Sequence, residues 1–192
     1  MQNSNNKNYI YLDKIQFEYK KNEPIFLKTI NLEIKKGKKI AIMGKSGSGK
    51  STLLHLITGL LNPSKGNIFF NGKNIQILKN NWNSKISYVS QNIFLFNSSI
   101  LNNITMYERK NTIDKKKLIL ALKISNLDKT IKKLKNGIET IIGVDSINFS
   151  GGEKQRIAIA RAVYKFPDVL ILDEFTSAID DETKNVILKG LF

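Results

Sequence analysis

The stretch GKSGSGKST at residues 44–52 constrains the fold of this chain more than any other part of its sequence. It fits the pattern G-x-x-x-x-G-K-[ST], a glycine-rich turn that joins a strand to a helix and wraps its backbone N–H groups around a phosphate chain. An apolar run at 40–43 predicts a buried strand before the loop, and the apolar stretch 51–61 predicts a helix after it. We therefore expect an α/β protein with an anion site at a helix N-terminus.

The residue types in this loop suit a nucleoside triphosphate. Glycines let the backbone curl tightly. Lys50 can reach the β- and γ-phosphates, and the Ser51 hydroxyl is a natural Mg²⁺ ligand. A plain Gly/Ser turn at a helix start is the alternative interpretation. The candidate nucleotide-binding residues here are Gly44, Lys45, Ser46, Gly47, Ser48, Gly49, Lys50, Ser51 and Thr52.

A second apolar run, DVLILDE at 168–174, predicts a buried strand that ends in two carboxylates. At that position Asp173 can hold the Mg²⁺ shell, and Glu174 can polarise an attacking water as a general base. Two ordinary surface carboxylates are the alternative. Combined with the phosphate loop, the pair indicates hydrolysis of a nucleoside triphosphate.

The other segments predict additions to a parallel α/β core. Residues 9–19, 25–34 and 67–73 have strand composition, whereas 92–165 is mainly helical with a break at 134–137. Within the helical part, Ser150 precedes two glycines and a predicted helix, so it is expected to be the N-cap of a second anion-binding helix terminus. Arg156 and Arg161 on that helix favour structural pairing over phosphate contact.

The composition of the chain limits which binding sites and which membrane segments it can contain. The net charge of +15 comes from 28 Lys and only 3 Arg, beside 22 Asn and 28 Ile, which is typical of a general residue bias more than of a basic binding patch. Without Cys, no disulfide or thiolate metal site is possible. The polar residues 1–8 do not resemble a signal peptide. The uncharged run at 86–107 is too polar for a membrane span.

Further motifs complete an ordered set. FSGGE lies at 149–153, SYVSQNIFLFNSSILNNI at 87–104, SAID at 177–180 and FEY at 17–19. With the phosphate loop and VLILDE, they make the chain resemble the nucleotide-binding domain of ABC transporters, and 87–104 resembles the exporter-type members. The resemblance implies a single α/β domain over 1–192 with a P-loop NTPase fold. Residues 9–90 and 161–192 would form an N-terminal antiparallel β-subdomain together with an incomplete RecA-like parallel sheet core, and about 91–160 would form an inserted helical subdomain that carries FSGGE.

The resemblance also implies roles and partners. Two such domains would pair head to tail around two ATP and Mg²⁺, together with a fused or separate transmembrane domain at the cytoplasmic face of a membrane, and would drive export or flipping of a substrate. No nucleic acid is expected as a partner. The implied catalytic residues are Glu174, Lys50 and Gln91, the metal ligands are Ser51, Gln91 and Asp173, and the further ATP contacts are Tyr19 on adenine, Ser150, Gly151, Gly152, Glu153 and Asp180.

Two other functions remain open: a soluble ABC-type ATPase acting on ribosomes or nucleic acid, and a catalytically impaired nucleotide-binding fragment. Lys50 and Ser150 are 100 residues apart. That interval has room only for a compact helical subdomain, which favours a transporter over the nucleic-acid ATPases with long coiled-coil insertions.

Several features depart from the family pattern. Phe149 and Glu153 replace Leu and Gln in the signature, and GVDS at 143–146 places Val144 where a Glu usually contacts the transmembrane partner, with Asp145 beside it. The one histidine, His55, is not at the position of the family's switch histidine. We therefore expect a chain cut from a longer polypeptide, with a gap in its central sheet, marginal folding and weak hydrolysis by itself.

Overall fold

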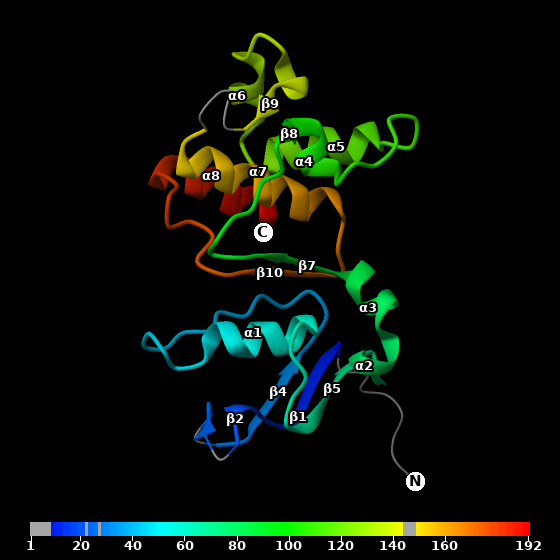
Figure 1. Ribbon diagram of the computed structural model, residues 1–192, viewed down its shortest axis with the longest axis vertical. Coiled ribbons are helices and arrows are strands. Elements are labelled where there is room, and N and C mark those ends of the chain that lie inside the picture. The colour runs from blue at the N-terminus through cyan, green and yellow to red at the C-terminus, as the bar shows by residue number, and fades with distance from the viewer. Residues whose placement is uncertain (1–8, 22, 27, 144–148) are drawn as a thin grey trace. The chain divides into compact units, whose positions relative to one another are not determined.

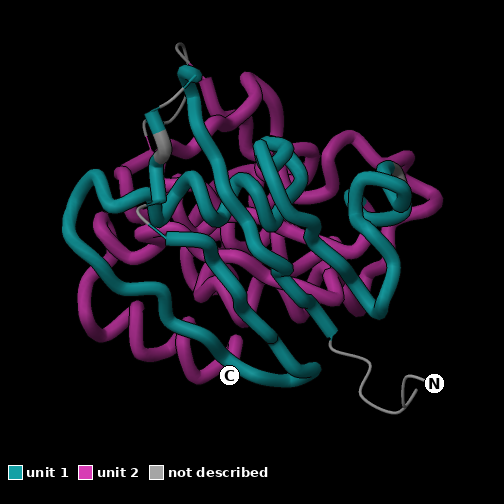
Figure 2. Tube along the Cα trace, turned by 90° about the horizontal axis from the view of Figure 1, so that it is seen from below, with its two compact units in different colours: residues 1–83 teal, residues 84–192 magenta. Residues whose placement is uncertain are grey.

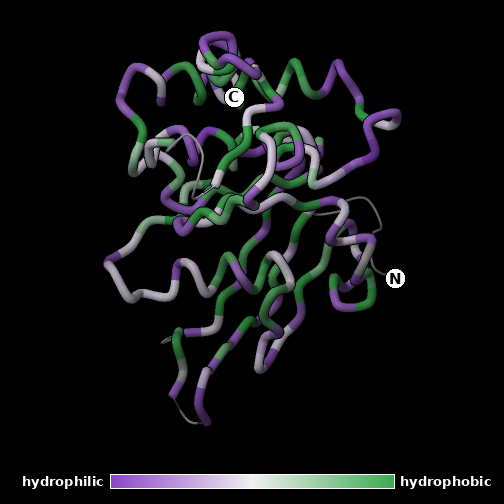
Figure 3. Tube along the Cα trace, turned by 45° about the horizontal axis from the view of Figure 1, so that its top comes forward, coloured by the Kyte–Doolittle hydropathy of each residue, from purple (hydrophilic) through white to green (hydrophobic). Residues whose placement is uncertain are grey.

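The computed structural model describes residues 9–21, 23–26, 28–143 and 149–192. The chain divides into two compact units, unit 1 (residues 1–83) and unit 2 (residues 84–192), drawn in two colours in Figure 2. Each unit is described by itself. In the described part of the chain, no helix has both the length and the apolar character needed to cross a bilayer (Figure 3).

Unit 1 is organised around an antiparallel sheet with the strand order β4-β1-β5-β6 (Figure 1). Alternate residues of β1, such as Ile10 and Leu12, are buried, and Leu12 lies opposite Ile68 on the neighbouring strand. The strands of this unit are β1 (Ile10–Gln16), β2 (Glu18–Lys20), β3 (Glu23–Pro24), β4 (Ile30–Ile34), β5 (Lys65–Phe70) and β6 (Lys73–Asn74). The predicted strand at 25–34 is therefore shorter than expected, because only its second half pairs with β1.

The helices of unit 1 cover apolar residues of the same unit. They are α1 (Lys50–Thr58), α2 (Ile75–Leu78) and α3 (Asn80–Lys85). The Trp82 ring packs 4.9 Å from the Phe70 ring, and its indole N–H donates a hydrogen bond of 3.1 Å to the Ile57 carbonyl. Because the buried ring and its N–H are both used inside the unit, Trp82 is a core residue.

The expectation of a buried strand at 40–43 is wrong. These residues have no strand pairing, and the side chains of Ile40 and Met43 are 48% and 89% exposed. The four strands of the unit 1 sheet pair only among themselves, so the described chain offers this segment no hydrogen-bonded neighbour. An apolar run becomes a buried strand only where neighbouring strands satisfy its backbone.

Unit 2 contains a parallel pair of strands, and one of them, β10, is the strand predicted at 168–174. β7 (Ile86–Val89) pairs with β10 (Val169–Leu172) in register, with Ile86 opposite Val169 and Val89 opposite Leu172. A separate short pair joins β8 (Ser98–Ser99) to β9 (Ile141–Ile142) in antiparallel orientation. The parallel pair fixes the direction in which both β7 and β10 present their C-terminal ends.

Helix α7 (Gly151–Tyr164) is the longest described helix of unit 2, and more than half of its residues are buried. Its Ile157, Ile159 and Ala160 are fully buried and pack with residues of α4 and α5 in one apolar cluster. The remaining helices are α4 (Ile100–Thr105), α5 (Lys115–Ile124), α6 (Asp128–Lys132), the 3₁₀ turn η1 (Gly137–Glu139) and α8 (Asp181–Leu191). The predicted helical middle is thus confirmed, with its break at η1.

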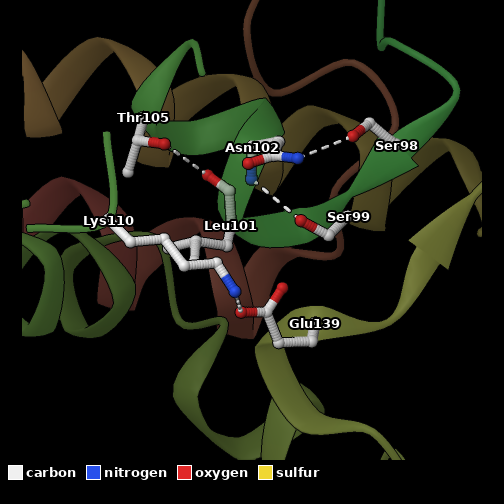
Figure 4. Close-up of polar contacts among 7 residues, drawn as sticks. All are labelled: Ser98, Ser99, Leu101, Asn102, Thr105, Lys110 and Glu139. Atoms are coloured by element: carbon white, nitrogen blue, oxygen red, sulfur yellow. Dashed lines mark hydrogen bonds and ion pairs between the residues drawn. The ribbon is translucent and has the colours of Figure 1, made fainter. Parts of the chain in front are cut away.

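Local hydrogen bonds define α4, as Figure 4 shows. Ser99 is its N-cap, and its hydroxyl accepts a bond of 3.1 Å from the Asn102 N–H. Asn102 in turn donates from its side chain to the Ser98 hydroxyl at 2.9 Å. The Thr105 hydroxyl bonds back to the Leu101 carbonyl at 2.9 Å.

The two arginines of α7, Arg156 and Arg161, each donate hydrogen bonds to other residues of unit 2. Arg161 donates to the Asn103 carbonyl at 2.7 Å, to the Asn103 side-chain oxygen at 3.0 Å and to the Phe94 carbonyl at 3.0 Å. Burial lowers the pKa of the Arg161 guanidinium. Arg156 donates to the Asn126 carbonyl at 2.7 Å. The structural interpretation of both residues is confirmed.

We predict that Arg161→Lys lowers the free energy of unfolding by about 2 kcal/mol, because an ammonium cannot reproduce the three directed bonds of the guanidinium fork. Urea denaturation of the purified chain measures the change. Arg109→Lys, at an exposed position, is the matched control and is expected to leave stability unchanged. Equal destabilisation by the two variants would contradict the assignment.

Candidate functional site

The phosphate loop of unit 1 needs its glycines. Gly47 and Gly49 have left-handed backbones, with φ of +76° and +85°. A Cβ on Gly44 would lie 2.7 Å from the Ser48 hydroxyl oxygen, and one on Gly49 would lie 2.8 Å from Ile25. Side chains at these positions would therefore open the turn that joins the loop to α1.

The start of α1 suits an anion. Its N-cap is Gly49, so no side chain caps the helix, and the first N–H groups are left for another acceptor. The Lys50 ammonium donates bonds of 2.9 Å to the carbonyls of both Gly44 and Lys45. A positive charge and a helix N-terminus are thereby held at the same loop, where each favours a phosphate group.

Tyr19 lies beside the helix that follows the loop. Its hydroxyl is 3.1 Å from the Thr52 hydroxyl, and its ring packs edge-on against Phe17 with centroids 4.8 Å apart. The side chain is nevertheless 61% exposed. Sequence reasoning selected Tyr19 but missed its bond to Thr52, because the two residues are 33 positions apart and neither type of side chain signals the pairing.

In unit 2, the parallel strands bring Asp173 to a buried position at the end of β10. Its N–H donates to the Val89 carbonyl at 2.9 Å, which extends the ladder by one residue. The Tyr88 hydroxyl donates to the Asp173 carboxylate at 3.1 Å. Burial and the hydrogen bond to this carboxylate raise the pKa of Tyr88 above its ordinary value, because both favour the protonated phenol. The sequence did not single out Tyr88.

The Glu174 side chain is exposed, and the Gln91 side chain holds it by a hydrogen bond. The Gln91 amide nitrogen donates to a Glu174 carboxylate oxygen at 2.5 Å. Glu174 also has a left-handed backbone with φ of +46°, which is strained for a residue with a side chain. The structure therefore brings together two predicted site residues that are 83 positions apart.

Residues Ser150 to Gly152, called the signature turn below, begin α7 with a capping box. The Ser150 hydroxyl accepts from the Glu153 N–H at 3.2 Å, and the Glu153 carboxylate accepts from the Ser150 N–H at 2.8 Å. The predicted N-cap role of Ser150 is confirmed. Glu153, whose S-x-x-E spacing is the sequence mark of such a box, stabilises the same turn.

The segment 177–180 passes directly beside the signature turn. A Cβ on Gly152 would lie 2.7 Å from the Ala178 carbonyl oxygen, whereas one on Gly151 would lie 3.4 Å from the Ala178 Cβ. Asp180 ends this segment as the N-cap of α8, where the Thr183 N–H donates to its carboxylate at 2.8 Å. That bond holds the pKa of Asp180 below its ordinary value.

The metal donors are few. Among the described residues, no group of three His, Cys, Asp or Glu side chains could hold a metal. Unit 1 offers the Ser51 hydroxyl, while unit 2 offers the Asp173 carboxylate and the Gln91 amide oxygen. Oxygen donors of these types suit Mg²⁺, which keeps water and phosphate ligands and needs only one or two protein donors. Val144 and Asp145 lie outside the described residues.

Unit 2 also has a cavity of about 700 Å³. It is bordered by β7, the end of α4 and the C-terminal half of α7, and it includes neither Asp173 nor Glu174 in its lining. Exposed Phe94 and Met106 lie along it. The cavity is therefore a surface distinct from the carboxylates of unit 2.

Gly152→Ala is predicted to lower the free energy of unfolding by about 1–3 kcal/mol, because the added methyl group meets the backbone at Ala178. Gly151→Ala is the neighbouring control, and its added methyl group has room at ordinary contact distance. Urea denaturation compares the two variants. The close approach at Gly152 is contradicted if both variants unfold at the same urea concentration.

Residues 27–177 match the protein family described as "ABC transporter". The chain is 40% identical over 178 residues to the alpha-hemolysin translocation ATP-binding protein HlyB of Escherichia coli, a match that covers 92% of this chain and 25% of that protein. It is 38% identical over 188 residues to the ATP-dependent lipid A-core flippase of Pasteurella multocida (strain Pm70), covering 97% of this chain and 32% of the flippase.

Among solved structures, a bacterial Atm1-family ABC exporter with ATP bound is similar with a TM-score of 0.87 and 32% identity, over 97% of this chain and 32% of that one. The chain thus spans between a quarter and a third of the length of these relatives. The resemblance inferred from the motifs is confirmed, as is an α/β P-loop ATPase fold with parallel and antiparallel sheets.

Proposed function

We propose that this chain, which belongs to the ABC transporter family, binds and hydrolyses ATP to drive export or flipping of a substrate across a membrane. Members of the family are generally ATP-hydrolysing translocases. The observation that carries the proposal is the phosphate loop, in which two left-handed glycines, an uncapped helix N-terminus and the Lys50 ammonium converge. Its three relatives named above support the exporter type.

In unit 1, we assign the ATP phosphates to the loop and the adenine to Tyr19. Backbone N–H groups and Lys50 offset the phosphate charge. The exposed face of the Tyr19 ring offers a stacking surface, since its other contacts are an edge-on Phe17 and a hydroxyl bond to Thr52.

In unit 2, we assign Glu174 as the general base that acts on the attacking water. We assign Gln91 as the residue that orients this water. Asp173 and Gln91, with Ser51 of unit 1, are the residues that would hold Mg²⁺. The ion would supply charge neutralisation at the phosphates. The buried position of Asp173 and its bond from Tyr88 keep one carboxylate oxygen fixed in direction.

We further propose that two copies, or this chain and another such domain, pair head to tail around two ATP. In each chain the start of α7 would contact the ATP bound by the other chain through Ser150, Gly151, Gly152 and Glu153, with Asp180 nearby. Support comes from the exposure of Ser150 and Gly151 at a helix N-terminus that belongs to a different unit from the phosphate loop.

The transmembrane partner, fused or separate, would place this chain at the cytoplasmic face of a membrane. We assign the cavity beside Phe94 and Met106 to that partner, because exposed apolar residues at a hollow are typical of an interaction surface. A role on ribosomes or nucleic acid would instead show as RNA or DNA binding that weakens steeply with salt.

Glu174→Gln is predicted to lower ATP turnover by about 100-fold or more, since an amide cannot accept the proton of the attacking water. ATP binding and ATP-dependent pairing are expected to persist, because the phosphate loop and α7 are unchanged. Phosphate release and size-exclusion chromatography with ATP measure the two effects.

Glu182→Gln, an exposed change in the first turn of α8, is the matched control and should keep full turnover. Wild-type turnover in the Glu174→Gln chain would contradict the assignment of the base. ATP binding without turnover in the unmodified chain would identify a nucleotide-binding fragment.

Tyr19→Ala is predicted to raise the KM for ATP by about 10-fold with kcat unchanged, because stacking on a base contributes about 1–3 kcal/mol. Tyr19→Phe keeps the ring while it removes the hydroxyl, and it should retain the KM of the unmodified chain. If Phe and Ala raise KM equally, the hydroxyl bond to Thr52 matters and the adenine assignment is wrong.

A further inference from the structure

Gln155 is a buried amide at the centre of the contact between α7 and the segment that follows β10. Its side chain is 1% exposed. The amide nitrogen donates to the Glu174 carbonyl at 3.3 Å, and the amide oxygen accepts from the Ala178 N–H at 3.2 Å. Both ends of the amide are therefore used, and both partners are backbone groups of one five-residue stretch.

Gly152 provides a second contact on the same helix face, since positions three apart lie one above the other. There the Ala178 carbonyl approaches so closely that a Cβ would be 2.7 Å away. Residues 174–178 are thus tied to α7 at two levels. The Ser177 N–H bond to the Glu174 carbonyl, 3.2 Å long, closes the stretch into a turn.

The tie acts on a strained residue. Glu174 has φ of +46°, a backbone conformation that residues with side chains rarely adopt without support from their surroundings. Its backbone carbonyl accepts a hydrogen bond from the Gln155 amide, and its carboxylate accepts one from the Gln91 amide. Because the side chain is exposed, packing does not fix its direction. The Gln91 amide bonds the carboxylate itself, and the Gln155 amide holds the backbone of the same residue.

We propose that Gln155 is a positioning residue that links the signature turn, Ser150 to Gly152, with Glu174 of the same chain. Helix α7 is continuous from the turn through Gln155, so a displacement of its N-terminus moves the segment 174–178 with it. The inference rests on the proposed roles of Glu174 and of the signature turn. In a pair of chains, ATP held against one signature turn then sets the Glu174 that acts on the other ATP.

The kinetic test compares Gln155→Met, which keeps length and loses both hydrogen bonds, with the matched control Gln76→Met at an exposed position on α2. Gln155→Met should lower kcat by up to about 100-fold, the effect of a slightly misplaced catalytic group, with the KM for ATP unchanged.

A double-variant comparison separates positioning from general damage. In the Glu174→Gln background, Gln155→Met should cause no further loss of the residual rate, because the group it positions is already gone. A rate that falls by the same factor in both backgrounds would overturn the proposal, as would a KM that rises with the fall in kcat.

Amide hydrogen exchange decides the link without any turnover. Gln155→Met should speed exchange of the Ala178 N–H by at least about 10-fold, the loss of one hydrogen bond. Ser150→Ala alone should speed amide exchange at 175–178. The same substitution should have no such effect in a chain that already carries Gln155→Met. Unchanged exchange at Ala178 in Gln155→Met rejects the link, whereas absent turnover with these exchange effects rejects only the proposed function.

Discussion

Unit 2 depends on the burial of α7. Its isoleucines and alanines fill the apolar cluster, so the polar side chains on the same helix must find partners inside the protein. They find them in backbone groups: Arg161 meets the carbonyls of Phe94 and Asn103, and Gln155 meets Glu174 and Ala178. The helix that forms the core is for this reason also the helix that orients the segments around it. A change in its position cannot leave the site of unit 2 untouched.

The two helix N-termini of the candidate site differ in chemistry. The N-cap of α1 is a glycine, so its first N–H groups have no side-chain partner, and Lys50 adds positive charge beside them. The N-terminus of α7 has a capping box, and the Glu153 carboxylate offsets part of its dipole. An anion is therefore favoured more strongly at α1 than at α7. This difference agrees with the proposed roles of the two segments, a loop that holds ATP and a turn that closes over it.

Local patterns predicted much of this molecule. The phosphate loop, the N-cap at Ser150, the apolar strand β10 and the helical middle all follow from residue types within a few positions of each other. The predicted strand at 40–43 is wrong, because a strand also needs neighbouring strands that pair with its backbone, and apolar residues alone do not supply them. Tyr88 and Gln155 were missed for a related reason. Their partners lie 85 and 19 positions away, and no short spacing announces such a bond.

The geometry of Glu174 shows why a site of this kind is sensitive to residues that never touch a ligand. An exposed carboxylate on a strained backbone has many accessible directions. Gln91 bonds this carboxylate from the loop after β7, and Gln155 bonds the backbone carbonyl of the same residue from α7. Because both bonds hold the same residue, we expect the effects of losing them not to add. The position of Glu174 therefore depends on the loop after β7, on α7 and on the turn together.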